Sequence, residues 1–260
     1  MKKIILFFFL LQVNNLMAQS KMNIYYTNGS VLSIPISDID SLYYINANTC
    51  PAIMTDIDGN IYNAVEIGTQ CWMKENLATT RYRNGNLIMT NLSNTDWSTT
   101  TIGAYSEYNN DTTISSVYGK LYNWYAVVNS SGLCPSGWHV PDNFDWNRLV
   151  ELIDTNADTN CVSCMQSLTA GGALKEVGLA HWLGQNNGAT NSTGFTALPA
   201  GSRSSTNGSY SNLGYYTYFW TSISYSVSQS FYRSLLGNNG LISRTYVTKR
   251  TGLSVRCIKD

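Results

Sequence analysis

The spacing of apolar residues predicts a mixed α+β chain with one well-defined helix. After Pro141–Asp142, apolar residues recur at roughly helical spacing and would form a stripe along one side of a helix. The stripe consists of Phe144, Trp146, Leu149, Val150 and Leu152. An aspartate in the first turn favours a helix start here, because its charge complements the helix macrodipole. A second helix is expected within residues 163–177, where Gly171 and Gly172 weaken the pattern.

Short apolar runs on either side of turn residues predict hairpins near the N-terminus. Asn28–Gly29 lies between the β-rich runs 23–26 and 31–34, and this arrangement is a strong hairpin signal. Asp58–Gly59 is the expected turn of another hairpin within residues 50–80.

The rest of the chain divides into loops, a buried stretch and a long β-rich region. Residues 84–118 are rich in Asn, Ser, Thr and Gly and predict long loops, whereas the aromatic stretch 118–128 is expected to be buried. From Phe195 onward, short apolar runs alternate with Gly and Asn turns, so we expect strands as far as the C-terminus. Trp138, Trp146 and Trp220 are expected in the core.

The N-terminus has the pattern of a cleaved secretory signal. Lys2 and Lys3 precede the apolar run 4–11, which is too short to span a bilayer, and Ala18 offers a cleavage point. We therefore divide the chain into a signal peptide (1–18), a small β-rich segment (19–49) and one domain (50–260). The residue directly after the cleavage point is Gln19 and not a cysteine, and no later segment is apolar enough to span a membrane. We expect an exported protein that is not a lipoprotein, in the periplasm, on the outer surface or secreted.

Composition narrows the classes of partner. Without residues 1–18 the chain keeps 14 basic and 16 acidic residues, and this near-neutral balance argues against nucleic acid, which needs a basic patch. Charged residues make up only 12% of the chain, which suggests uncharged partners. A hydrophobic content of 43% is enough to bury a substantial core.

The even number of cysteines favours disulfides in an exported chain. Six cysteines allow fifteen connectivities, so the pairing is open from number alone. The pairs we expect are Cys134–Cys257 and Cys50–Cys71. Cys161 and Cys164 are left to pair locally or to stay reduced, and the compartment favours a local disulfide.

An ordered string of motifs runs through residues 50–260. The motifs are Asp56-Ile57-Asp58-Gly59-Asn60-Ile61-Tyr62, Ile67 to Leu77 around Cys71-Trp72, Tyr118 to Trp124, Cys134-Pro135-Ser136-Gly137-Trp138-His139-Val140-Pro141, Gly194-Phe195, Leu198 to Arg203, Phe219-Trp220-Thr221-Ser222 and Ser254-Val255-Arg256-Cys257. In this order they resemble a known family, the Fibrobacter succinogenes major paralogous domain (FISUMP). Such domains occur on exported and surface proteins of Fibrobacteres and Bacteroidetes.

The resemblance also suggests a fold. The motif order looks distantly like the C-type-lectin-like fold, which formylglycine-generating enzymes share. That fold implies two helices, a loop-rich half, short antiparallel strands and a paired N- and C-terminal β region. A disulfide from the middle of the chain to the last strand would suit it. Because a fold does not determine a function, the implied function stays open.

Few residues form a catalytic or metal-binding pattern. Asp56-x-Asp58-Gly59 invites a calcium hypothesis, but its glycine is not at the position that an EF-hand loop requires, so a turn is the simpler interpretation. Cys161-x-x-Cys164 lacks a second pair for zinc. His139 and His181 have no nucleophile motif beside them, and His139 is expected to be structural. We therefore expect no catalytic residues, no metal and no cofactor, with calcium left as an unsupported option.

Aromatic and amide side chains in loop-like sequence are the candidate ligand-binding surface. Aromatic rings offer an apolar face for sugar rings, while amides and arginine can bind hydroxyl groups. The candidate residues are Trp182, Asn186, Arg203, Tyr210, Tyr215, Tyr216 and Tyr218, with Gln185 and Asn187 beside them.

These observations favour an exported, non-catalytic binding or adhesion module that recognises a glycan or another cell-surface polymer. One alternative is a structural protein that assembles through residues 19–49. Another is an enzyme related to formylglycine generation, whose relatives use a closely placed, copper-binding cysteine pair late in the chain. Here Cys257 stands alone in its region, and Cys161 and Cys164 lie earlier.

Overall fold

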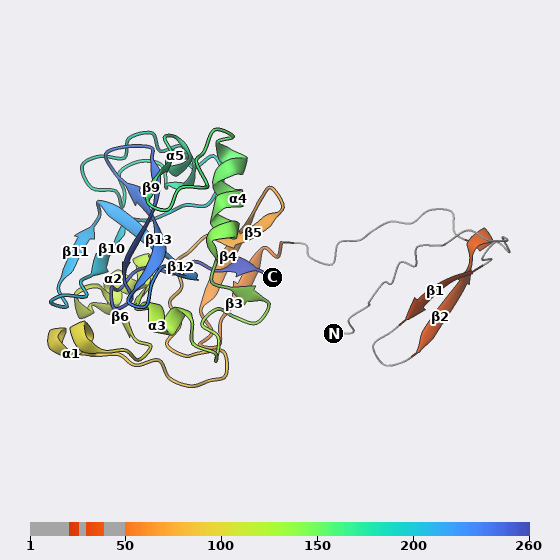
Figure 1. The fold of residues 1–260 in the computed structure, drawn as a ribbon, viewed down its shortest axis with the longest axis horizontal. Helices are drawn as coiled ribbons and strands as arrows, with labels where there is room; N and C mark the ends of the chain where they lie inside the picture. The colour runs from red at the N-terminus through yellow and green to blue at the C-terminus, as the bar shows by residue number, and fades with distance from the viewer. Residues whose placement is uncertain (1–20, 26–29, 39–49) are drawn as a thin grey trace. The chain divides into compact units, whose positions relative to one another are not determined.

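A computed structural model describes residues 21–25, 30–38 and 50–260, and these divide between two units, Met1–Thr49 and Cys50–Asp260 (Figure 1). The expected signal peptide, residues 1–18, lies outside the described residues. Within the described residues, no helix has the length and apolar character needed to cross a membrane.

The first unit contains a two-stranded hairpin. Strand β1 (Lys21–Tyr25) pairs antiparallel with β2 (Val31–Pro35), and a 3-10 helix, η1 (Ile36–Asp38), follows. The pairing agrees with the predicted hairpin, although its Asn28–Gly29 turn lies outside the described residues. Two strands alone bury little apolar surface and are marginally stable.

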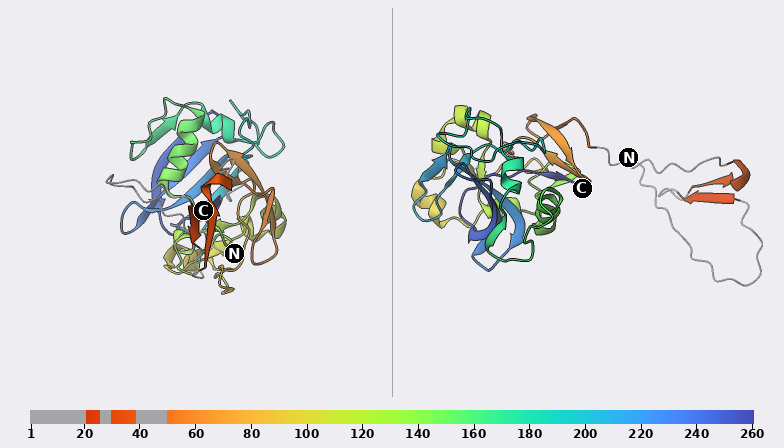
Figure 2. Two further views of the ribbon diagram at one scale, coloured as in Figure 1. Left: turned by 90° about the vertical axis from the view of Figure 1, so that its right-hand side faces the viewer. Right: turned by 90° about the horizontal axis from the view of Figure 1, so that it is seen from above.

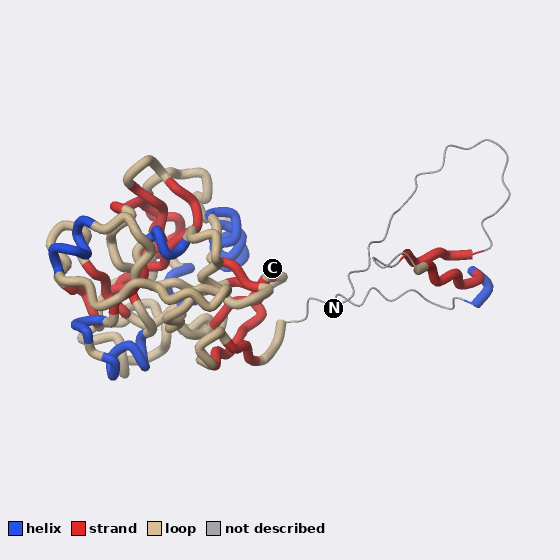
Figure 3. Tube along the Cα trace, turned by 90° about the horizontal axis from the view of Figure 1, so that it is seen from below, coloured by secondary structure: helices blue, strands red, loops and turns tan. Residues whose placement is uncertain are grey.

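Short elements joined by long loops build the second unit (Figure 3). Its helices are α1 (Asn94–Thr99), η2 (Tyr108–Asn110), α2 (Thr112–Tyr118), α3 (Trp124–Val127), α4 (Asn143–Ile153) and α5 (Ala170–Leu174). Its strands are β3 (Ile53–Thr55), β4 (Ile61–Ile67), β5 (Gln70–Met73), β6 (Tyr105–Ser106), β7 (Leu121–Tyr122), β8 (Trp138–His139), β9 (Cys164–Ser167), β10 (Ala200–Arg203), β11 (Tyr210–Leu213), β12 (Tyr216–Ser224), β13 (Gln229–Leu236), β14 (Ile242–Thr248) and β15 (Ile258–Lys259).

A five-stranded sheet brings the beginning, middle and end of this unit together. Its strand order is β3-β4-β5-β15-β8, so the blue C-terminal strand in Figure 1 lies between β5 and β8. Ile258 of β15 lies opposite Trp72 on one side and His139 on the other. The β3–β4 hairpin turns at Asp58–Gly59 as expected, and Gly59 has a φ of +86°, a conformation that glycine adopts without strain.

A four-stranded sheet forms the second large layer. Its order is β12-β13-β14-β9, so the late strands are joined at one edge by a strand from the middle of the chain. Helix α4 lies across these strands in the left view of Figure 2. A capping box starts α4: the Asp142 carboxylate accepts from the backbone N–H groups of Phe144 and Asp145, and Asp145 accepts from the Asp142 N–H.

Four aromatic rings join the two sheets and α4. Trp72 of β5 lies 4.9 Å from Trp146 of α4 and 5.6 Å from Phe195, and Trp146 lies 5.6 Å from Phe219 of β12, measured between ring centroids. All four are buried, as are Trp138 and Trp220, so the three tryptophans expected in the core do lie there. Such rings contribute more to stability than other side chains of the core because each removes a large apolar area from water.

Several expectations about secondary structure are wrong. Residues 163–177 begin as strand β9, and only Ala170–Leu174 are helical. Residues 84–118 contain α1 and α2 as well as loops, because Ser93 and Asp111 cap backbone N–H groups at the helix starts. On α4, Phe144 and Leu152 are exposed, so the buried stripe is narrower than expected.

Three disulfides are present and match the pairs expected from the sequence. Cys50 bonds to Cys71 and Cys134 bonds to Cys257, while Cys161 and Cys164 form the local pair. The unit is therefore a mixed α+β fold of mostly antiparallel strands, and the C-type-lectin-like assignment stays a prediction.

Candidate functional site

The residues predicted to form a binding surface lie in three different settings. Trp182 and Arg203 are in the interior, 0% and 1% exposed, so the expectation of surface positions is wrong for both. The Trp182 indole Nε1 donates to the carbonyl oxygen of Ala197 at 3.1 Å. The Arg203 guanidinium lies 4.4 Å from the Trp97 ring centroid and donates to the carbonyl oxygens of Gly208 and Leu92. Packing against distant segments, which local sequence does not reveal, buries both side chains.

Three further predicted residues are partly buried and hold loops together. Tyr210 donates from its hydroxyl to Asn110, and the Asn186 side-chain amide donates to two carbonyl oxygens of the preceding loop. The Tyr218 hydroxyl accepts from Asn212 at 3.0 Å, and burial raises the pKa of Tyr218 to about 12. These contacts indicate that the three residues support the fold of the region.

Tyr215 and Tyr216 line an open hollow of about 340 Å³. The other residues of this tyrosine hollow are Leu183, Gly184, Gln185, Gly237 and Asn238. Tyr215 is 53% and Leu183 is 50% exposed, so both offer apolar surface to a ligand. The exposed Gln185 and Asn238 contribute amide side chains, which can both donate and accept hydrogen bonds.

Backbone hydrogen bonds fix the three chain segments that form the tyrosine hollow. The N–H of Leu183 donates to Gly214 O at 2.7 Å, and the N–H of Gly237 donates to Tyr215 O at 2.9 Å. Gly237 is required by space, since a Cβ there would lie 2.6 Å from the carbonyl oxygen of Gln185. The shape of the hollow is therefore set before a ligand arrives.

A buried lysine lies behind the same segments. The Lys175 ammonium donates to the carbonyl oxygens of Asn187, Leu236 and Asn239 at 2.7 to 2.9 Å, and it lies 5.2 Å from the Trp182 ring centroid. Among the described residues, no carboxylate lies within ion-pair distance of it. Burial lowers the pKa of Lys175 to about 8. Because its acceptors flank the hollow, this side chain ties the two walls together.

Comparison of the sequence with known protein families identifies the domain. A family model, the Fibrobacter succinogenes major domain, matches residues 65–259, which is most of the second unit. The chain belongs to this family. No curated protein and no solved structure matches the chain.

The motifs that mark the Fibrobacter succinogenes major domain serve its core. Trp72, Trp138 and Trp220 are buried, and the buried Arg256 lies 4.2 Å from the Phe195 ring centroid and donates to the Phe195 carbonyl oxygen. Leu183–Gln185 and Gly237–Asn238, by contrast, lie outside those motifs. The motifs therefore account for the core, and these parts of the tyrosine hollow lie in segments between them.

Sequence reasoning missed Lys175 and the Gly237–Asn238 side of the tyrosine hollow. Two local signals were present. Residues 237–240 are a turn-forming run of Gly and Asn, and Lys175 comes directly after an apolar, glycine-rich stretch. Neither signal reveals which distant segment lies opposite.

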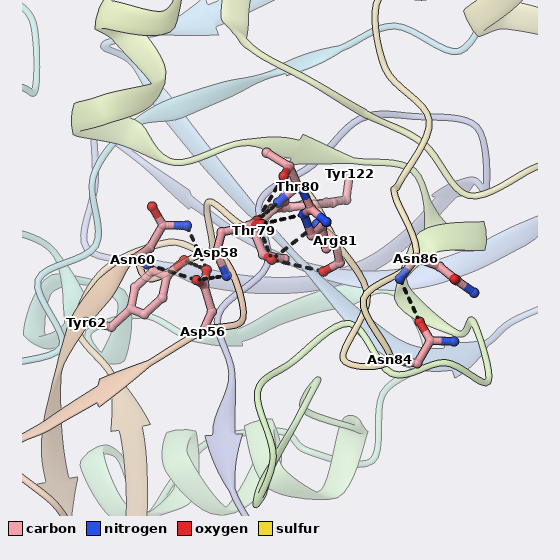
Figure 4. Close-up of polar contacts among 10 residues, drawn as sticks. All are labelled: Asp56, Asp58, Asn60, Tyr62, Thr79, Thr80, Arg81, Asn84, Asn86 and Tyr122. Atoms are coloured by element: carbon pink, nitrogen blue, oxygen red, sulfur yellow. Dashed lines mark hydrogen bonds and ion pairs between the residues drawn. The ribbon is translucent and has the colours of Figure 1, made fainter.

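The Asp56–Asp58 cluster in this domain is a hydrogen-bonded turn (Figure 4). Asp56 accepts from the N–H groups of Asp58 and Asn60, from the Asn60 amide and from the Tyr62 hydroxyl. Asp58 accepts from Thr79 and Thr80 and pairs with Arg81. Although burial opposes it, hydrogen bonding from these threonines lowers the pKa of Asp58. Donors of the protein occupy the carboxylate oxygens, which favours the turn interpretation over calcium.

The histidines contact carboxylates. The His139 ring nitrogens lie 2.7 Å from an Asp260 oxygen and 3.2 Å from an Asp145 oxygen. Hydrogen bonding to Asp145 raises the pKa of His139 against the effect of burial, and Asp260 adds to the rise. His139 thereby links the C-terminal residue to the start of α4, a structural role. The His181 ring lies 2.8 Å from the Glu176 carboxylate and packs edge-on against Tyr118.

One group of possible metal ligands occurs among the described residues. The Asp158 carboxylate lies within 4.8 Å of the sulfurs of Cys161 and Cys164. The two sulfurs form a disulfide, however, and metal ligation by cysteine requires the thiolate. In this oxidised state the group does not present a metal-binding set.

Proposed function

We propose that this protein is an exported, non-catalytic binding module whose tyrosine hollow takes a glycan or another cell-surface polymer. The observation that carries the proposal is the joining of two exposed or half-exposed tyrosines with two amide side chains in one preformed hollow. Aromatic faces suit the apolar faces of sugar rings, and amides suit hydroxyl groups. A preformed site also loses little conformational freedom on binding.

Export is supported by the disulfides and by the N-terminal pattern. Three disulfides use all six cysteines, and such bonds persist in oxidising compartments. The basic and apolar residues at positions 2–11 resemble a secretory signal. The test is to express the full chain in a bacterial host with a periplasm and to determine the N-terminal residue of the fractionated protein. Cleavage after Ala18 supports export, and an uncleaved cytoplasmic product contradicts it.

The binding test is a polysaccharide and glycan array probed with oxidised residues 19–260, with and without calcium. A reproducible hit supports a binding module, and its response to chelation tests the calcium option. A blank array contradicts glycan recognition. The ligand found is then titrated into Tyr215→Ala and Tyr216→Ala, each expected to weaken binding at least tenfold because each removes ring contact area.

Tyr225→Ala is the matched control for these variants. Tyr225 is 42% exposed but stacks on Tyr246 at the far end of β12, away from the residues of the hollow. We expect this variant to bind as the wild type does. Trp182→Ala is unsuitable, because loss of a fully buried indole would destabilise the fold.

The enzyme alternative is weakened by the bonding of the cysteines. Catalysis of the formylglycine-generating type needs a cysteine pair near the end of the chain, and here Cys257 is bonded to Cys134. Thiol titration of the unreduced protein checks this point. No free thiol is expected, and two reactive thiols per chain would revive the alternative.

The assembly alternative rests on the β1–β2 hairpin and on η1 after it, where Val31, Leu32 and Ile36 are exposed. Sedimentation of residues 19–260 and of residues 50–260 tests it. Assembly that disappears on deletion supports the alternative, whereas unchanged behaviour leaves it without a basis.

A further inference from the structure

A second hollow, of about 240 Å³, lies where three loops of the domain meet. Residues 55–57, Thr79 with Arg81 and Arg83, and residues 133–136 line it. None of these residues lines the tyrosine hollow. Cys134 is in its wall, so the Cys134–Cys257 disulfide ties this arginine hollow to the last strand of the chain.

Arg83 presents a guanidinium that forms no ion pair with a carboxylate of the described residues. Its Nε donates to the carbonyl oxygen of Cys134 at 3.0 Å and its Nη2 donates to that of Trp138 at 2.8 Å. Both acceptors are uncharged, and no acidic side chain of the described residues lies within ion-pair distance. Nη1 is left for a ligand. Anchoring by two carbonyls reduces the entropy that the side chain would lose on binding an anion.

Arg81 contributes a second guanidinium to the same hollow. Its Nε lies 3.2 Å from Asp58 Oδ1, and its side chain is 49% exposed. Within the described part of the chain, neither Nη atom of Arg81 has a hydrogen-bond partner. The paired Nη groups of a guanidinium form a planar fork that matches the two oxygens of a carboxylate or sulfate.

Asp56 lines the arginine hollow and Asp58 lies close to it in sequence, yet the hydrogen bonds of these two carboxylates leave the Nη donors unoccupied. Asp56 accepts from four donors of its own turn, and Asp58 Oδ2 accepts from Thr79 and Thr80 (Figure 4). Asp58 reaches Arg81 only through Nε. The acids therefore hold Arg81 and the turn in place, while the unused N–H groups of both arginines remain available to an anion.

We propose that the arginine hollow binds an oxyanion group, a carboxylate or a sulfate ester, carried by an acidic glycan. The identity of the polymer rests on the proposed glycan-binding function, and the arginine hollow adds a subsite that selects acidic sugars over neutral ones. The exposed Ser136 provides a further hydroxyl at its edge.

The test is an NMR titration of residues 19–260 labelled with ¹⁵N, with tetragalacturonate, a chondroitin sulfate tetrasaccharide and cellotetraose as separate probes. We expect saturable shifts of backbone N–H signals in residues 79–83 and 133–136 with at least one acidic probe and none there with cellotetraose. The carboxylate-only and sulfated probes distinguish the two oxyanions. Binding should weaken several-fold between about 50 mM and about 500 mM salt, because exposed charges are screened.

Arg81→Gln is the decisive variant, and its affinity for the acidic probe should be at least fivefold lower than that of the wild type. Arg148→Gln is the control, since Arg148 is an arginine on α4 that donates to Thr69 and does not line the arginine hollow. Arg83→Gln should also weaken binding, but it removes two loop anchors, so it is interpreted only if the spectrum stays native.

Three results would overturn the proposal: no local shifts with either acidic probe, equal shifts with cellotetraose, or wild-type binding by Arg81→Gln. Because these signals are local to residues 79–83 and 133–136, the outcome is independent of Tyr215→Ala and Tyr216→Ala. Failure at one hollow is therefore distinguishable from failure at the other.

Discussion

Several positively charged side chains of this protein are buried and donate hydrogen bonds to uncharged oxygen atoms. Lys175, Arg203 and Arg256 are at most 1% exposed, and each donates to backbone carbonyl oxygens while lying near an aromatic ring. Burial lowers the pKa of Arg256 to about 9 and also lowers that of Arg203. An unpaired buried charge is expensive unless hydrogen bonds satisfy it, so these cations must be accommodated by several loops at once.

Lys175→Met should destabilise the fold by about 3 kcal/mol, because three carbonyl oxygens lose a buried donor. Lys249→Met is the control: Lys249 is also buried but donates to one carbonyl oxygen, that of Val227, and lies 4.3 Å from the Trp124 ring centroid. We expect the free energy of unfolding of Lys249→Met to be lower than that of the wild type by about 1 kcal/mol. Urea denaturation followed by tryptophan fluorescence measures both values. Equal losses would contradict a special role for the three contacts of Lys175.

His139 should give a pH-dependent contribution to stability. Hydrogen bonding to Asp145 raises its folded pKa above 6.5, so its contribution is complete below about pH 6.5 and is lost as pH rises through the folded pKa. The ring is 43% exposed, and we expect no more than about 1 kcal/mol. The free energy of unfolding of wild type and His139→Gln is compared at about pH 5.5 and about pH 8.5. A wild-type advantage that grows with pH would contradict the assignment.

Among the elements, α4 was the most predictable because its signals are local. Its cap at Asp142 and its buried Trp146, Leu149 and Val150 lie within one short stretch. Strand β9, by contrast, was predicted as helix, because its pairing partner β14 lies about eighty residues later in the chain. Pairing with a distant strand overrides the local preference of such a segment.

Asp142→Ala should destabilise the protein by about 1 kcal/mol, because two N–H groups at the start of α4 lose their acceptor. Asp142→Asn keeps an acceptor oxygen and should retain most of that stability. Chemical denaturation of the two variants in parallel makes the comparison. A loss in Asp142→Asn as large as that in Asp142→Ala would show that charge rather than capping matters.

At the scale of the whole molecule, the disulfides close loops of very different length. Cys134–Cys257 spans 123 residues and Cys50–Cys71 spans 21, whereas Cys161–Cys164 spans 3. The longest cross-link holds β15 between β5 and β8, where the final strand completes the five-stranded sheet.

A double variant with serine at both Cys134 and Cys257 should be less stable than the wild type by about 5 kcal/mol. Without this disulfide the unfolded chain is no longer closed into a long loop and gains entropy. The matching double replacement of Cys161 and Cys164 should cost about 2 kcal/mol. Thermal unfolding by calorimetry ranks the two variants. The reverse order would refute loop length as the main cause.

The sequence by itself determined the family, the mixed α+β class, helix α4, the Asp58–Gly59 turn and the burial of Trp138, Trp146 and Trp220. These features rest on motif order, on periodicity and on turn chemistry, all of which act over a few residues. The tertiary structure alone decided that Trp182 and Arg203 lie inside and that Lys175 ties together the walls of a hollow. The physical reason is that burial and pairing depend on which distant segments meet: Leu183, Tyr215 and Asn238 become neighbours only when β12 and β13 pair and the loops close over Lys175.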